Sequence, residues 1–136
     1  MKLEEIMAKR VVTVDMDDTL DVIRKIFDEV RFHHLVVINE KYKVVGVISD
    51  RDVLKALSPY LDTTSEQERD QVTLNKKTHQ VMSRQRITAS PEDSIEQAAA
   101  LLLENRISCL PVISEDQSLV GIVTWKDILK NLTIRS

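Results

Sequence analysis

The chain has 136 residues, of which 43% are apolar, and a formal net charge of −3. Such slight acidity gives no electrostatic reason to expect binding to nucleic acid or to an anionic membrane, and no apolar run approaches the roughly 20 residues of a membrane crossing. The first residues lack the apolar block of a signal peptide, and the single cysteine, Cys109, excludes a disulfide framework within one chain. We therefore expect a cytoplasmic protein.

The first 60 residues predict the order strand, helix, strand, strand, helix. The β-branched run at 10–14 predicts a short strand, and capping side chains at 17–19 precede a stripe of apolar residues at helical spacing. The apolar runs 35–38 and 44–48 predict a hairpin of buried strands. Pro59 ends a second helix. Its expected inner face consists of Val53, Leu54 and Leu57.

Residues 61–79 repeat nothing else in the chain and carry little apolar content. We interpret them as a linker that is partly helical. Within it, Ser65 is expected to cap a short polar helix, with Glu68 completing a capping box. The linker separates a first repeat, residues 1–60, from a second repeat, residues 80–136.

The second repeat has the same predicted elements in the same order. A strand at 86–89 and a capping cluster at 90–94 precede a helix, and the runs 110–113 and 119–123 predict paired strands before a last helix. The expected apolar face of the first of these helices consists of Ile95, Ala98, Ala99, Leu102 and Leu103. Ile23, Phe27, Leu102, Leu103 and Leu129 are candidates for the core or for an interface.

A fixed offset of 75 residues relates the two repeats without a gap. Gly46 and Gly121, the two glycines of the chain, lie at equivalent positions. The offset also pairs Met7 with Met82, Thr13 with Thr88, Asp18 with Asp93, and Leu35 with Leu110. The chain is therefore one five-element unit written twice.

Each glycine-containing strand is followed by a Ser/Thr-x-x-Asp motif, at which a helix is expected to begin. By itself this motif is an N-cap pattern, but its carboxylate can also accept two hydrogen bonds from the cis-diol of a ribose. A helix start and a nearby basic side chain both suit a phosphate group. The motif residues and their basic neighbours are Ser49, Arg51, Asp52, Thr124, Lys126 and Asp127.

A duplicated β-α-β-β-α unit that carries Leu110-Pro111-Val112 and then Gly-apolar-apolar-Ser/Thr-x-x-Asp resembles a pair of cystathionine-β-synthase (CBS) domains. The resemblance covers all of the chain except the linker. It implies an α+β fold in which the repeats are related by a pseudo-two-fold axis, with the sheets packed together and the helices outside. It also implies a stand-alone regulatory module rather than an enzyme, assembled as a homodimer and acting on an unidentified protein partner.

In CBS pairs, two clefts between the repeats usually hold an adenosine-containing ligand such as AMP, ADP, ATP or S-adenosylmethionine. The resemblance implies that no other cofactor is required. It assigns ribose to Asp52 in one cleft and to Asp127 in the other, with Ser49 and Thr124 near ribose or phosphate. The residues implied to flank the base are Thr88, Ala89, Leu110 and Pro111 in one cleft, and Thr13, Val14, Leu35 and Val36 in the other. His33 and His34 stand where some relatives have basic residues that face phosphate.

The first repeat departs from the family pattern at two positions. Val36 stands where the second repeat has Pro111, and Met16 stands where it has Pro91. The backbone near the base position of the first repeat is therefore expected to be less typical. We expect the cleft that contains Asp127 to bind the base and ribose. We make no prediction of whether the other cleft is occupied.

The sequence does not exclude two other functions. The first is a structural dimerisation module with empty clefts. The second is a small enzyme or metal protein that uses His33, His34 and Cys109. A metal site needs three or four ligands, and only His79 adds to these candidates. We therefore predict no metal site and no catalytic residues.

Overall fold

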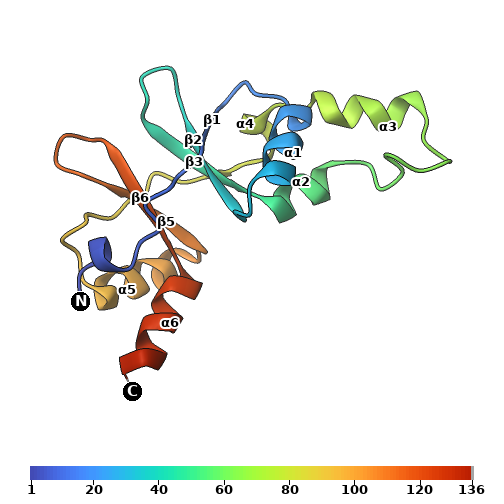
Figure 1. The fold of residues 1–136 in the computed structure, drawn as a ribbon. Coiled ribbons are helices and arrows are strands. Elements are labelled where there is room, and N and C mark those ends of the chain that lie inside the picture. Colours follow the sequence, from blue (N-terminus) through green and yellow to red (C-terminus); the bar gives the residue numbers. More distant parts are fainter. Residues whose placement is uncertain (136) are drawn as a thin grey trace. The chain divides into compact units, whose positions relative to one another are not determined.

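The computed structural model describes residues 1–135, with side chains up to residue 132, and confirms the predicted α+β class. The chain forms two compact units, which Figure 1 shows in the colours of the sequence. One unit contains residues 12–86. The other combines residues 1–11 with the chain from Ile87 onward. Among the described residues, no helix is long and apolar enough to cross a membrane.

The unit of residues 12–86 contains a four-stranded sheet and the helices that connect its strands. Its elements are β1 (Thr13–Asp15), α1 (Leu20–Glu29), β2 (His34–Ile38), β3 (Val44–Ser49), α2 (Asp50–Ala56), α3 (Glu68–Val72), η2 (Thr73–Asn75), α4 (Thr78–Val81) and β4 (Ser83–Arg84). The strand order is β1-β2-β3-β4, with β1 parallel to β2 and the other neighbours antiparallel. The buried core consists of Val14, Leu20, Ile23, Leu35, Val37, Ile48, Val53 and Met82.

The other unit is built from a two-stranded sheet and two long helices. Its elements are η1 (Leu3–Glu5), α5 (Ile95–Asn105), β5 (Cys109–Ile113), β6 (Leu119–Thr124) and α6 (Trp125–Arg135). Strands β5 and β6 pair antiparallel. The buried core consists of Leu3, Ala89, Ile95, Ala98, Leu102, Leu110, Val112, Val123 and Ile128. Of the predicted interface candidates, Leu102 is therefore core, whereas Leu103 and Leu129 are 67% and 58% exposed.

The strand predicted at 86–89 is reduced to one bridge, between Ala89 and Val112. A proline explains the difference from the first repeat. There, the amide of Val36 donates to the carbonyl of Val12 at 3.2 Å. Pro111 occupies the position of Val36 and has no amide hydrogen, so this bond cannot form in the second repeat.

Each unit includes a short segment that precedes the strands and helices of the other unit in the sequence. Residues 1–8, here called the N-terminal arm, pack with the second repeat, and residues 76–83, the middle arm, pack with the first. The two arms make the same hydrogen bonds at the 75-residue offset. The amide of Leu20 donates to the Lys76 carbonyl at 2.8 Å, and the amide of Ile95 donates to the Met1 carbonyl at 3.2 Å. Each unit thus combines the main strands and helices of one repeat with the arm that precedes those of the other repeat.

The two glycines let the arms approach the sheets. A Cβ on Gly46 would lie 2.5 Å from the Ser83 carbonyl oxygen, and a Cβ on Gly121 would lie 2.5 Å from Met7 Sδ. Neither glycine has a positive φ. These positions therefore require glycine for space and not for backbone conformation.

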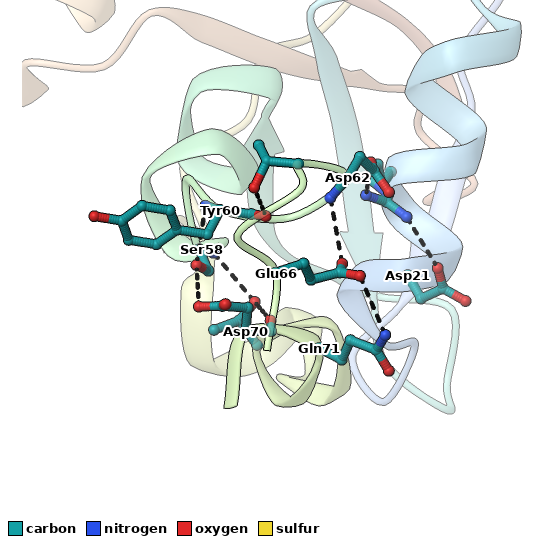
Figure 2. Close-up of polar contacts among 10 residues, drawn as sticks. Asp21, Ser58, Tyr60, Asp62, Glu66, Asp70 and Gln71 are labelled. Atoms are coloured by element: carbon teal, nitrogen blue, oxygen red, sulfur yellow. Dashed lines mark hydrogen bonds and ion pairs between the residues drawn. The ribbon is translucent and has the colours of Figure 1, made fainter. Parts of the chain in front are cut away.

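The stretch between the repeats folds around one buried carboxylate (Figure 2). Asp70 is only 5% exposed, and it accepts hydrogen bonds at 2.7 Å from the Ser58 hydroxyl and from the Gln67 amide. The hydrogen bond from Ser58 lowers the pKa of Asp70 below its ordinary value of 3.8. Helix α3 therefore has Gln67 as its N-cap, and the prediction that Ser65 caps it was wrong. The carboxylate of Asp70 accepts the hydrogen bond of the Gln67 amide at the start of the helix. Ser65 lies three residues before the helix and is too far along the chain to cap it.

Replacing Gly46 by alanine is expected to destabilise the protein by about 1–3 kcal/mol, because the new methyl overlaps a backbone oxygen. Gly121→Ala meets the flexible Met7 side chain first, so the additional change Met7→Ala should recover part of its loss. The corresponding Met82→Ala should not rescue Gly46→Ala. Urea unfolding measures the four variants, with Glu40→Ala in the exposed hairpin turn as control. Equal stability of Gly46→Ala and wild type would contradict this close packing.

Replacing Asp70 by alanine is expected to loosen residues 58–72 without unfolding the sheet, because Ser58 and the Gln67 amide lose their acceptor. Hydrogen exchange should accelerate at the Gln67 amide, while amides in β2 and β3 keep their protection. The pKa of Asp70 is lowered, so its stabilisation is present above pH 3.8 and is lost as the pH falls through that lowered value. Unchanged exchange at Gln67 would show that the carboxylate does not hold this segment.

Candidate functional site

The predicted motif of the first repeat lies where β3 ends and α2 begins. Ser49 is the N-cap of α2, and its hydroxyl accepts a hydrogen bond from the Asp52 amide at 3.1 Å. In return, Asp52 Oδ2 accepts a hydrogen bond from the Ser49 amide at 2.9 Å. Among the described residues, no partner contacts Asp52 Oδ1. The capping role therefore occupies one carboxylate oxygen and leaves the other available.

The motif of the second repeat, at the junction of β6 and α6, keeps the bond from the backbone amide to the carboxylate, but its hydroxyl donates instead of accepting. Asp127 Oδ2 accepts hydrogen bonds from the Thr124 amide at 2.9 Å and from the Thr124 hydroxyl at 3.2 Å. Within residues 1–132, whose side chains the structure describes, Oδ1 of Asp127 has no hydrogen-bond partner. Both aspartates thus combine a cap with a free oxygen that can accept a hydrogen bond from a ligand.

Asp52 lines a hollow of about 430 Å³, here called the Asp52 hollow. Helix α2 and the middle arm form its walls, and the lining residues are Asp52, Lys55, Ala56, Lys76, Gln80 and Val81. Lys76 Nζ donates to the Ala56 carbonyl at the end of α2 at 2.7 Å. The arm residues had no functional signal in the sequence, because only the fold brings them beside a helix about 20 residues earlier.

His33 and His34 do not line the Asp52 hollow. His33 Nδ1 lies 2.9 Å from Asp50 Oδ2, and this hydrogen bond lowers the pKa of Asp50. His33 and Asp50 line a larger hollow of about 810 Å³ between α1, α2 and the segment that follows α2, whereas His34 lines neither hollow. His34 opens β2 and pairs with Ser49, and its partial burial lowers its pKa from 6.5.

The residues predicted to flank a base fall into two groups, one in each unit. In the unit of residues 12–86, Val14 and Leu35 belong to the core. Thr13 and Val36 lie on the opposite face of the sheet, where Thr13 is exposed and Val36 is fully buried. In the other unit, Ala89 and Leu110 belong to the core. Pro111 is buried on the opposite face of β5, and Thr88 is half-buried. The core members can offer a ligand only their backbone groups.

The basic residues predicted beside the motifs are exposed. Arg51 and Lys126 lie in the first turns of α2 and α6, and neither side chain forms an ion pair within the described residues. Neither lines the Asp52 hollow. Among the described residues, no group of three or more His, Cys, Asp or Glu side chains could hold a metal ion.

The comparison with protein families identifies both repeats. The model of the CBS domain matches residues 3–59 and 79–134. An inosine-5′-monophosphate dehydrogenase of Methanocaldococcus jannaschii is 33% identical over 129 residues. The match covers 95% of this chain, which spans 23% of the length of that enzyme.

Solved CBS structures share the fold. The CBS domain of a CBS domain-containing membrane protein from Sphaerobacter thermophilus is 32% identical with a TM-score of 0.79, and the match covers 96% of this chain and 86% of that one. CBSX2 in complex with AMP is 28% identical with a TM-score of 0.72, covering 99% and 98%. A CBS domain pair in complex with 5′-methylthioadenosine and S-adenosyl-L-methionine is 26% identical with a TM-score of 0.75, covering 97% and 99%.

The stability of the protein is expected to fall as the pH drops below 6.5 because of His34. Its pKa is lowered in the folded state, so its stabilising contribution is complete above pH 6.5 and declines as the pH falls below that value. The charges of Asp50 and Asp52 raise the pKa of His34 and so partly oppose the effect of burial, whereas the charge of His33 lowers this pKa further. NMR titration of the His34 ring should give a pKa below 6.5. The thermal midpoint of His34→Gln should vary less with pH, whereas His33→Gln should retain the decline. A His34 pKa above 6.5 would contradict this assignment.

Proposed function

Because the chain belongs to the CBS domain family, we propose that it is a regulatory module that binds an adenosine-containing ligand. AMP, ADP, ATP and S-adenosylmethionine are the candidate ligands. Binding would change the conformation of the module or its affinity for a protein partner. A ligand can do this only to the extent that its affinity differs between two states of the protein.

The observation that carries this proposal is the free oxygen on each motif aspartate. Asp52 and Asp127 are held in fixed orientations by their caps, and each keeps Oδ1 without a protein partner among the described residues. A fixed carboxylate is suited to accept hydrogen bonds from the hydroxyls of a ribose. We assign base and ribose binding first to the site of Asp127 and Thr124.

Two relatives support the ligand class. CBSX2 was crystallised with AMP, and another CBS pair with 5′-methylthioadenosine and S-adenosyl-L-methionine. All three ligands contain adenosine, although their charges differ. The proposal for this chain therefore names the adenosyl group, with Thr88, Ala89, Leu110 and Pro111, or Thr13, Val14 and Val36, beside the base.

We further propose a cytoplasmic homodimer without catalytic activity of its own. Leu54, Leu103 and Leu129 lie on helices and are 74%, 67% and 58% exposed. Burying such side chains against a second copy is favourable, because it removes apolar surface from water. The same leucines also support the rival function, a dimerisation module that binds no ligand.

Calorimetry with AMP, ADP, ATP and S-adenosylmethionine distinguishes these functions. At least one ligand is expected to bind with a Kd in the micromolar to millimolar range, about −8 to −4 kcal/mol. Asp127→Asn keeps an oxygen for the cap but loses the charge and one acceptor, so it should weaken binding at least tenfold and leave the thermal midpoint nearly unchanged. Asp52→Asn tests the first repeat in the same way.

Asp93→Asn is the matched control, because Asp93 lies in the same unit as Asp127 and its carboxylate accepts the Ser90 amide away from the motif. It should bind like wild type. Absence of heat with all four ligands up to millimolar concentration would favour the ligand-free dimerisation module. Unchanged binding in both motif variants would show that the ligand binds elsewhere.

A further inference from the structure

The Asp52 hollow carries more positive than negative charge. Its ionisable lining residues are one carboxylate, Asp52, and two ammonium groups, Lys55 and Lys76. Lys55 lies one turn after Asp52 on α2 and forms no ion pair within the described residues. Lys76 uses one of its three hydrogens on the Ala56 carbonyl and keeps two others for a ligand. A carboxylate with two cations nearby is suited to a sugar that carries phosphate groups.

The equivalent positions of the second repeat carry less positive charge. At the 75-residue offset, Lys130 replaces Lys55, the uncharged side chain of Met1 replaces Lys76, and Glu5 replaces Gln80. Together with Asp127, these side chains carry two negative charges and one positive charge, and the Met1 ammonium adds a second positive charge. The sum is therefore zero, whereas the Asp52 hollow carries one net positive charge.

The hydrogen bonds of the arms support this equivalence. Gln80 Oε1 accepts a hydrogen bond from the Lys77 amide at 2.8 Å, and Glu5 Oε2 accepts one from the Lys2 amide at 2.9 Å. The two side chains therefore hold the same capping position on their arms, one neutral and the other anionic. The sign of charge is the main chemical difference between the two positions.

Resting on the nucleotide-binding function proposed above, we propose that the two repeats select adenosyl ligands of different charge. The first repeat takes a nucleotide with several phosphate groups, held by Lys55 and Lys76. The second repeat takes an adenosyl ligand without phosphate, neutral or cationic at its 5′ end. Gln80 and Glu5 set this difference, because a carboxylate repels a phosphate group and an amide does not.

Each repeat can be measured while the other is silenced. Calorimetry in the Asp127→Asn background reports on the first repeat, where ATP should bind at least tenfold more tightly than adenosine. In the Asp52→Asn background, adenosine or S-adenosylmethionine should bind at least as tightly as ATP. A stoichiometry of one ligand per chain checks that the other repeat is silent.

Substitutions at Gln80 and Glu5 then test whether these two side chains cause the difference in ligand preference. Gln80→Glu keeps the shape and the capping oxygen, and it should reduce the preference for ATP over adenosine at the first repeat by about threefold to tenfold. Lys55→Met should act in the same direction. Glu5→Gln should increase ATP affinity at the second repeat. Lys41→Met, in the exposed hairpin turn, removes one positive charge elsewhere and should change none of these ratios.

The outcomes separate this proposal from the one on which it rests. If adenosine and ATP both bind but their affinity ratio is the same in the two repeats, or does not respond to Gln80→Glu, the charge selection is wrong and nucleotide binding stands. If no adenosyl ligand binds to the wild-type protein, both proposals fail. A reduced ratio in Lys41→Met equal to that in Lys55→Met would mean that only net charge acts, which also overturns the assignment.

Discussion

The fold depends on the close contact between each arm and the glycine of the sheet on which it lies. At Gly46 and Gly121, a single added carbon would lie within 2.5 Å of the arm. The contact closes each unit with residues that are distant in the sequence, since the N-terminal arm completes the second repeat and the middle arm completes the first. Met7 and Met82 fit at these crossings because an unbranched, polarizable side chain adapts to a narrow space.

The middle arm also shapes one candidate ligand site, the Asp52 hollow. The middle arm caps the end of α2 through Lys76 and lines the Asp52 hollow with Gln80, so the packing that closes the unit also forms one wall of the hollow. The motif aspartates stabilise the helix starts, and we propose that they also bind the ligand. One oxygen stabilises the helix start, and the rigid position of the other reduces the entropy that a ligand contact would cost.

Small differences between nearly identical repeats have clear physical consequences. Pro111 removes the amide that Val36 uses, and the strand beside it shrinks to a single bridge. His33, which only the first repeat has, is held by Asp50 outside the Asp52 hollow. A duplication preserves the backbone plan, whereas single side chains change pairing, charge and pKa locally.

The sequence alone determined the duplication, the order of most elements and the capping motifs, because helix periodicity, strand runs and N-caps arise from residues a few positions apart. Even there, Ser65 was the wrong cap, since the carboxylate of Asp70 provided a better interaction. Only the tertiary structure decided which arm lies on which repeat, which residues face the Asp52 hollow and where His33 points. Lys76 and Gln80 follow α2 by about 20 residues, and no local pattern encodes a contact that forms only when separate segments pack together.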